Sequence, residues 1–262
     1  MGLFSKKWRI VTIAGFPIEV NLTFLILLGL VFLVQGGLVG ILLTLLVFAS
    51  ILVHELGHAV VARRLGVRIA GIELQFFGGV AKMVTPPRSA RDEIIIAVAG
   101  PAVSLGIALV AIFVDVWVRF PLLSYLGYTN LVLGVFNLLP ALPLDGGRVF
   151  RAWRAQRIGV LAATNQAVKL SKYIAIGLGV LGLIFGQFFV AALAVMIYLM
   201  ARAELNSAWM LHYNDVPAER INYDILDPTG RVIYDPRGTT GDAADEERFN
   251  EVRRVIFRQR RW

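Results

Sequence analysis

The sequence lacks cysteine entirely and contains only 3 histidines. Disulfides, cysteine nucleophiles and thiolate metal sites are therefore excluded, which leaves histidine and carboxylate as the strong metal ligands. Charged residues are also scarce, at 17% of 262 residues, whereas 57% are hydrophobic and the mean hydropathy is +0.70. Ordinary soluble domains of this length are much less apolar. The composition predicts a membrane protein that crosses the bilayer several times.

Six apolar segments are long enough to be membrane-spanning helices: residues 20–34, 38–62, 94–118, 122–139, 173–185 and 188–201. The last two are short and are joined only by Gly186 and Gln187, which predicts a tight hairpin. Basic residues precede the first segment, as in a signal peptide. The run VQGGLVG after it offers no convincing small-residue cleavage site, so we expect this segment to be retained as an anchor.

The distribution of basic residues predicts the orientation in a cell membrane. Six spans place both termini on one side, and that side would hold all of the 26 lysines and arginines except Arg119. The positive-inside rule then puts both termini in the cytoplasm. The net charge of +8 suits anionic lipid headgroups and needs no nucleic-acid partner. Asp115, four residues before Arg119, is expected to form an interfacial ion pair with it.

The run HELGH places His54 and His58 on one face of a helix, with Glu55 beside them. Histidines spaced i, i+4 can bind one metal ion, and the neighbouring glutamate can act as a base. A chance match is the alternative, but the run follows the uncharged apolar residues 38–53, and ionisable residues inside such segments are usually functional. The pattern predicts a metal site inside the membrane. His212 lies in a polar stretch and is expected at the surface.

Asp145 follows the fourth span in the run NLLPALPLDGGR, between Pro143 and a glycine pair. A broken helix at membrane depth is tolerated only where its backbone lines a polar cavity or is buried in protein. At about 1.5 Å of helix rise per residue, His54 lies roughly 13 Å below the cytoplasmic surface. Asp145 approaches from the same side, so we expect it close to His54 and His58.

Four motifs in this order resemble the site-2 proteases, the intramembrane zinc metalloproteases: HELGH, FFGGVAK at 76–82, AGPAVS at 99–104 and NLLPALPLDGGR at 137–148. The resemblance covers about residues 16–203 and includes GFPIEVN, which is similar to the family's short strand leading into the membrane. It implies one zinc ion per chain, held by His54, His58 and Asp145, with Glu55 as the catalytic base. Such a ligand set leaves one tetrahedral position for water.

The resemblance implies further that Asn137 steadies the substrate or the oxyanion, although a helix–helix hydrogen bond would also explain an asparagine there. Residues 76–82 correspond to a membrane-dipping β-hairpin that offers its edge to an unwound substrate. Gly78 and Gly79 would permit close backbone approach, and turn formation alone is the alternative. The expected fold is an all-α polytopic membrane protein with about six transmembrane helices and this small hairpin.

The implied activity is zinc endopeptidase cleavage within or near transmembrane segments of membrane-protein substrates, as in regulated intramembrane proteolysis. Prenyl-protein-processing metalloproteases also carry HExxH, but their third ligand is Glu where this chain has Asp145. A non-proteolytic zinc scaffold that binds transmembrane helices would have no need of Glu55. A GxGxxG pattern at Gly177, Gly179 and Gly182 lies in an apolar span, so it is expected to allow helix packing.

Two domains are expected: residues 1–210 as the six-span metalloprotease and 211–262 as a cytoplasmic tail. In the tail, apolar patches around DPTG could form a small hairpin, and RFNEVRRVIFRQRRW could form a basic amphipathic helix on the membrane or on a regulatory partner. The tail is too short for the PDZ or nucleotide-sensing regulatory domains of many relatives, so a minimal form is expected.

Overall fold

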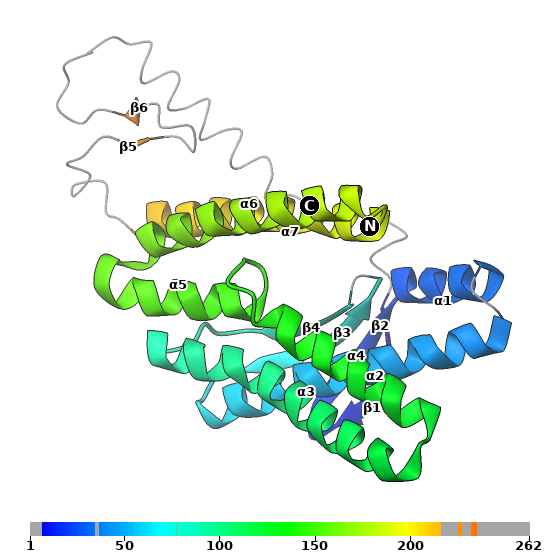
Figure 1. The fold of residues 1–262 in the computed structure, drawn as a ribbon. Coiled ribbons are helices and arrows are strands. Elements are labelled where there is room, and N and C mark those ends of the chain that lie inside the picture. The colour runs from blue at the N-terminus through cyan, green and yellow to red at the C-terminus, as the bar shows by residue number, and fades with distance from the viewer. Residues whose placement is uncertain (1–6, 35–36, 77, 216–224, 227–231, 235–262) are drawn as a thin grey trace. The chain divides into compact units, whose positions relative to one another are not determined.

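The computed structural model describes residues 7–34, 37–76, 78–215, 225–226 and 232–234. These residues form seven helices and six strands (Figure 1). The chain divides into two compact units, Met1–Leu205 and Asn206–Trp262. The first unit contains every element that positions the candidate site.

A four-stranded mixed sheet lies beside the first helices. Its strands β1 (Lys7–Ile13), β2 (Phe16–Asn21), β3 (Ile69–Gln75) and β4 (Gly78–Met83) lie in the order β1-β2-β3-β4. The outer pairs are antiparallel and the central β2–β3 pair is parallel. Parallel strands need a long crossover connection, and here it consists of the two helices between β2 and β3.

The expectation of an all-helical protein with one small hairpin was therefore wrong in its β content. The predicted strand at GFPIEVN is confirmed as β2, but β1 and β3 were missed, and residues 76–82 contain mainly the second strand of the hairpin. The β2–β3 pairing joins Ile18 to Ile72 across 54 positions of sequence, and no local pattern reveals such a contact.

The helices are α1 (Leu22–Val34), α2 (Gly37–Arg64), α3 (Ala90–Val118), α4 (Pro121–Asn137), α5 (Asp145–Ile158), α6 (Val160–Ile184) and α7 (Phe188–Asp215). Four of them, α2, α3, α6 and α7, are long and apolar enough to cross a membrane. The chain is thus a polytopic membrane protein. Each of the six predicted spans overlaps a helix, but the first begins within β2, α1 has only 13 residues and α4 has 17.

Apolar side chains lie both inside and outside the helical bundle. Phe16, Ile18 and Val20 alternate on the buried face of β2 and pack with Phe48 of α2 and Ile72 of β3. Many large apolar side chains on the helices are exposed, which suits contact with lipid tails that are as apolar as leucine.

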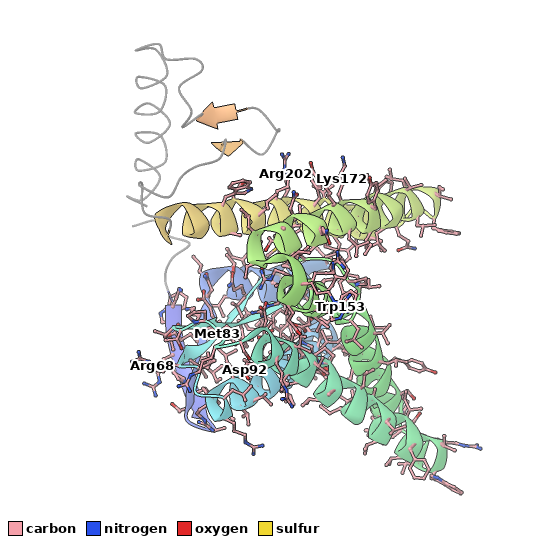
Figure 2. The ribbon with its side chains drawn as sticks, turned by 90° about the vertical axis from the view of Figure 1, so that its left-hand side faces the viewer. Arg68, Met83, Asp92, Trp153, Lys172 and Arg202 are labelled. Atoms are coloured by element: carbon pink, nitrogen blue, oxygen red, sulfur yellow. The ribbon has the colours of Figure 1, made fainter. Side chains whose placement is uncertain are left out.

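The predicted hairpin of the last two spans is confirmed by the tight turn between α6 and α7, which lie side by side in Figures 1 and 2. The Gln187 N–H donates to the Gly182 carbonyl at 2.6 Å. A Cβ on Gly182 would lie 2.8 Å from the Ala191 backbone nitrogen, so this glycine allows close helix packing, as expected. Gly177 has open space around its Cβ position and contributes no such contact.

The expected ion pair between Asp115 and Arg119 is absent from the part of the chain that the structure describes. Arg119 ends α3 in a left-handed conformation, with φ of 52°, so the helical i, i+4 geometry does not apply to it. Ser124 of α4 instead donates a hydrogen bond to Asp115 Oδ2.

In the second unit, β5 (Ile225–Leu226) and β6 (Val232–Tyr234) pair antiparallel. The predicted basic helix lies outside the described residues, as does the side chain of His212. The division of the chain at residue 210 stays a prediction.

One network of charged side chains connects all four strands of the first sheet. Glu73 of β3 is buried, accepts a hydrogen bond from Asn21 Nδ2 of β2 at 2.9 Å and pairs with Lys7 of β1 at 2.6 Å. Lys82 of β4 pairs with Glu73 and, at 3.2 Å, with Glu19 of β2. Burial alone would raise the pKa of Glu73, but hydrogen bonds from Lys7, Lys82 and Asn21 lower this pKa to about 2.

We expect Glu73→Gln to lower the free energy of unfolding at pH 7 by about 1–3 kcal/mol, because Lys7 and Lys82 lose the charged acceptor that the buried Glu73 provides. A depressed folded-state pKa stabilises the fold above the usual pKa of 4.5, and this contribution is lost as the pH falls toward 2. The measurement is thermal unfolding of metal-free protein in detergent at pH 7 and pH 3. The difference between the wild type and the variant should be clearly smaller at pH 3 than at pH 7; an equal difference at both would contradict the charge network.

Candidate metal centre

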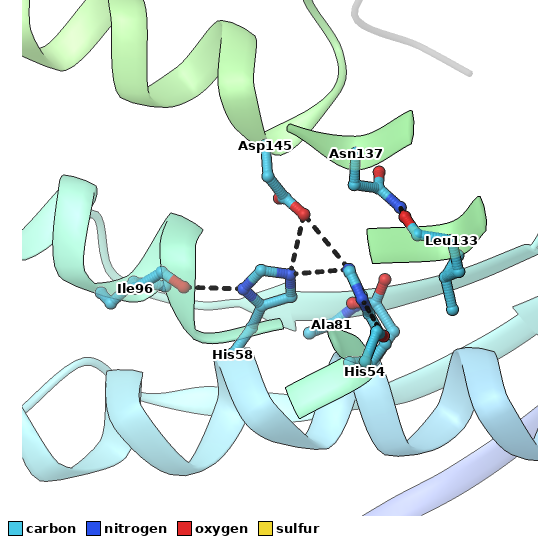
Figure 3. A network of polar contacts seen from close by, with 9 residues as sticks. His54, His58, Ala81, Ile96, Leu133, Asn137 and Asp145 are labelled. Carbon is cyan, nitrogen blue, oxygen red and sulfur yellow. Dashed lines mark hydrogen bonds and ion pairs between the residues drawn. The ribbon is translucent and has the colours of Figure 1, made fainter. Parts of the chain in front are cut away.

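Two histidines of α2 form one side of the site. His54 and His58 are one helical turn apart and nearly fully buried, with their ring centroids 4.8 Å apart. Their Nε2 atoms lie 3.2 Å from each other and face the same point (Figure 3).

Asp145 reaches this point because the chain reverses after α4. The α4 helix ends at Asn137, residues 138–144 form an irregular segment, and α5 begins at Asp145. A Cβ on Gly146 would lie 2.5 Å from the Leu139 carbonyl oxygen, so the glycine lets α5 start against that segment. The Leu142 N–H donates to Ser171 Oγ of α6 at 2.7 Å, which anchors the segment.

The three side chains fit a tetrahedral zinc ion. Asp145 Oδ2 lies 3.2 Å from the Nε2 atoms of both His54 and His58, which are themselves 3.2 Å apart. Ligand atoms around zinc with bonds of about 2.0–2.1 Å and tetrahedral angles are about 3.3 Å from one another. Two imidazole nitrogens and a carboxylate oxygen are also donors that zinc accepts. The expected approach of Asp145 to the histidines is found.

The outer nitrogen of each imidazole has a partner on α3. His58 Nδ1 lies 2.7 Å from the Ile96 carbonyl oxygen, and His54 Nδ1 lies 2.9 Å from Ser104 Oγ. Metal-bound histidines generally donate their second N–H in this way, which fixes the tautomer and the ring orientation.

The Glu55 side chain extends from α2 toward the edge strand β4. Its Oε2 accepts a hydrogen bond from the Ala81 N–H at 3.1 Å. A Cβ on Gly79 would lie 3.0 Å from Glu55 Cγ, so the absence of a side chain lets β4 approach the glutamate. Gly78 has no such neighbour but has φ of +132°, which favours glycine at the turn. Gly78 therefore permits the turn, whereas Gly79 permits the close approach of β4 to Glu55.

Asn137 is at the end of α4, and its side chain donates to the Leu133 carbonyl of the same helix at 2.9 Å (Figure 3). Asn137 therefore makes no helix–helix hydrogen bond among the described residues, and a different asparagine makes such a bond. Asn130, fully buried, donates to Ser50 Oγ of α2 at 2.9 Å. Sequence reasoning missed Asn130, Ser50 and Ser104, although small polar residues within apolar spans were a usable signal.

Comparisons with known proteins agree with this geometry. A family model described as Peptidase family M50 matches residues 42–120 and 116–182. A zinc metalloprotease of Methanocaldococcus jannaschii is 36% identical over 204 residues, which cover 75% of this chain and 60% of that protein. A relative from Synechocystis sp. is 34% identical over 69% of this chain and 54% of its own length. The chain therefore spans little more than half the length of these curated relatives.

A solved structure shows the same fold. The site-2 protease from Methanocaldococcus jannaschii superposes with a TM-score of 0.62 at 35% sequence identity, over 76% of this chain and 95% of that one. The family match extends over more than half of the 262 residues. The chain belongs to peptidase family M50, the site-2 protease family of zinc metalloproteases.

Proposed function

We propose that this chain is an intramembrane zinc endopeptidase that hydrolyses peptide bonds within or near transmembrane segments of membrane-protein substrates, as in regulated intramembrane proteolysis. The observation that carries the proposal is the buried convergence of Asp145 with His54 and His58 of the apolar helix α2, with Glu55 beside them. Family membership supports the reaction class.

His54, His58 and Asp145 would hold one zinc ion per chain. A bound zinc ion would supply Lewis-acid polarisation of the scissile carbonyl and would make a water molecule more acidic. Glu55 follows His54 directly, so its carboxylate is beside the site on the same helix. In the proposed reaction it accepts the proton of the attacking water and passes it to the leaving amine. The Ala81 N–H holds this carboxylate in place until substrate binds.

The free edge of β4 is the proposed substrate-binding element. Because the Ala81 N–H points to Glu55, it is not used in the ladder with β3 and belongs to this edge. An extended substrate segment beside β4 would lie next to Glu55, and Gly79 would allow its backbone to come close. A transmembrane helix protects its own carbonyls, so the cleaved segment must first unwind. Substrates with helix-weakening residues are expected.

Asn137 is proposed to steady the substrate or the oxyanion. Its amide now donates to Leu133, so contact with a substrate would require the side chain to rotate away from its own helix. Asn137 is only a few residues before Asp145 in the sequence, and Figure 3 shows the two side chains in the same region, which supports a role for Asn137 near the reacting groups.

Six spans with both termini in the cytoplasm of a cell remain our proposal for the topology. Arg63 and Arg64 end α2, and Arg68, labelled in Figure 2, follows them, so basic residues gather on the side where α2 ends. This basic side would face anionic lipid headgroups of the bilayer. A regulatory partner of the tail stays a proposal without a structural basis in the described residues.

The competing function is a zinc scaffold that binds transmembrane helices without cleaving them. Both functions require zinc, but only the peptidase requires Glu55 as a base. Cleavage and zinc content therefore have to be measured on the same preparations.

We expect Glu55→Gln to reduce the cleavage rate of a single-span substrate by at least about 100-fold, because general-base catalysis contributes that much or more to the rate. Zinc content should remain stoichiometric in this variant, whereas Asp145→Ala should lose both activity and zinc affinity. Purified protein is assayed by cleavage and metal analysis, with Asp92→Asn on the first turn of α3 as the control. Zinc binding without cleavage by the wild type, across a panel of helix-weakened substrates, would favour the scaffold.

Gly79→Ala is expected to raise KM or lower kcat several-fold while zinc content stays unchanged, because the added methyl group would press on Glu55 Cγ at 3.0 Å. Gly29→Ala in α1, where a Cβ has open space, is the matched control. The steady-state kinetics of substrate cleavage are measured for both variants and for the wild type. Equal kinetics for both variants would show that close approach of β4 to Glu55 is not needed.

The natural absence of cysteine permits a direct test of topology. Single cysteines replace Phe120 before α4, Gln187 between α6 and α7, and Arg88 before α3, all of which are exposed positions. We expect a membrane-impermeant maleimide to label Phe120→Cys and Gln187→Cys in intact cells, and to label Arg88→Cys only after permeabilisation. Labelling of Arg88→Cys in intact cells would reverse the proposed orientation.

A further inference from the structure

One face of α3 contacts both histidines through three residues spaced one helical turn apart: Ile96, Gly100 and Ser104. The Ile96 carbonyl lies against His58, and the Ser104 hydroxyl lies against His54. Between them, a Cβ on Gly100 would overlap His58 and would lie 2.8 Å from His54 Nε2. The missing side chain at position 100 lets α3 come close enough for both contacts.

Ser104 differs from other buried hydroxyls in the described helices. Ser50, Thr164 and Ser171 each donate to the carbonyl four residues earlier in their own helix. Ser104 is fully buried, and its hydrogen bond is made with His54 on α2. Its hydroxyl is thus directed at the imidazole across the helix interface.

The direction of this hydrogen bond follows from the position of the other ring nitrogen. A neutral imidazole carries its proton on one nitrogen and a lone pair on the other. His54 Nε2 faces Asp145 and His58, so metal binding there requires the lone pair on Nε2 and the proton on Nδ1. Nδ1 then donates, and Ser104 Oγ accepts at 2.9 Å.

We propose that Ser104 is a positioning residue for zinc, whose hydroxyl accepts the Nδ1 proton of His54 and holds the Nε2 lone pair toward the metal. The inference rests on the proposed zinc site and adds a residue outside the ligand set. Without the hydroxyl, a buried N–H would be left unpaired and the ring would lose its fixed tautomer and orientation. Loss of such an outer partner typically weakens metal binding by about 10- to 100-fold.

The test measures zinc affinity, by competition with a chelator, on the purified full chain in detergent. Ser104→Ala removes the acceptor, and Ser104→Cys keeps nearly the same shape with a weaker acceptor. Thr164→Val is the matched control, because Thr164 is fully buried and its hydroxyl bonds within its own helix. Thermal unfolding of the metal-free proteins is measured in parallel.

We expect Ser104→Ala to weaken zinc binding by about 10- to 100-fold. Ser104→Cys should fall between Ser104→Ala and the wild type, and it still provides the answer if Ser104→Ala does not fold. Thr164→Val should bind zinc like the wild type. In the zinc-bound wild type, nitrogen-15 NMR should show the His54 proton on Nδ1.

Wild-type zinc affinity in Ser104→Ala, or an equal loss in Thr164→Val, would overturn the proposal, as would a zinc-bound His54 protonated on Nε2. A purely structural role predicts that the metal-free unfolding temperature falls while zinc affinity is unchanged. A wild type that binds zinc but cleaves no substrate would overturn the peptidase function and leave the Ser104 result valid. A wild type without zinc would overturn both.

Discussion

Close packing of α3 against the histidine face of α2 is the constraint on which the site depends. The two rings are buried between apolar helices, where an unpaired N–H is costly, so each Nδ1 needs a partner within reach. Ile96 and Ser104 supply these partners only because Gly100 leaves no side chain between the helices. The same approach leaves both Nε2 atoms facing Asp145.

The sheet connects a charged network outside the four long apolar helices to the glutamate beside the metal site. Glu73 links strands β1, β2 and β4 through Lys7, Asn21 and Lys82. Lys82 is adjacent to Ala81, whose N–H holds Glu55. The register of β4 thus determines how the glutamate is placed, because a shift of one residue would turn the Ala81 N–H away from α2.

A second charged group connects the helices around Asp145, the candidate metal ligand on α5. Arg151, less than two turns after Asp145 begins this helix, pairs with Glu93 at the start of α3 and with Glu204 on α7. Like Glu73 in the sheet, it is a largely buried charge whose partners lie on other elements, as such charges require. Asp145 is therefore held from two directions, by the glycine-dependent start of α5 and by this pairing further along the helix.

The sequence by itself determined the membrane class and the two histidines with their glutamate, because periodicity and motif spacing are local properties. The approach of Asp145 to the histidines was expected from the orientation of the spans and from the family resemblance. It also indicated β2 and the α6–α7 turn. Only the tertiary structure decided the four-stranded sheet and the partners Ser104 and Asn130. It also separated the turn-forming Gly78 from Gly79, which lies against Glu55. Those features depend on contacts between segments tens of residues apart, and a polar residue in an apolar span does not reveal from its neighbours which helix it will face.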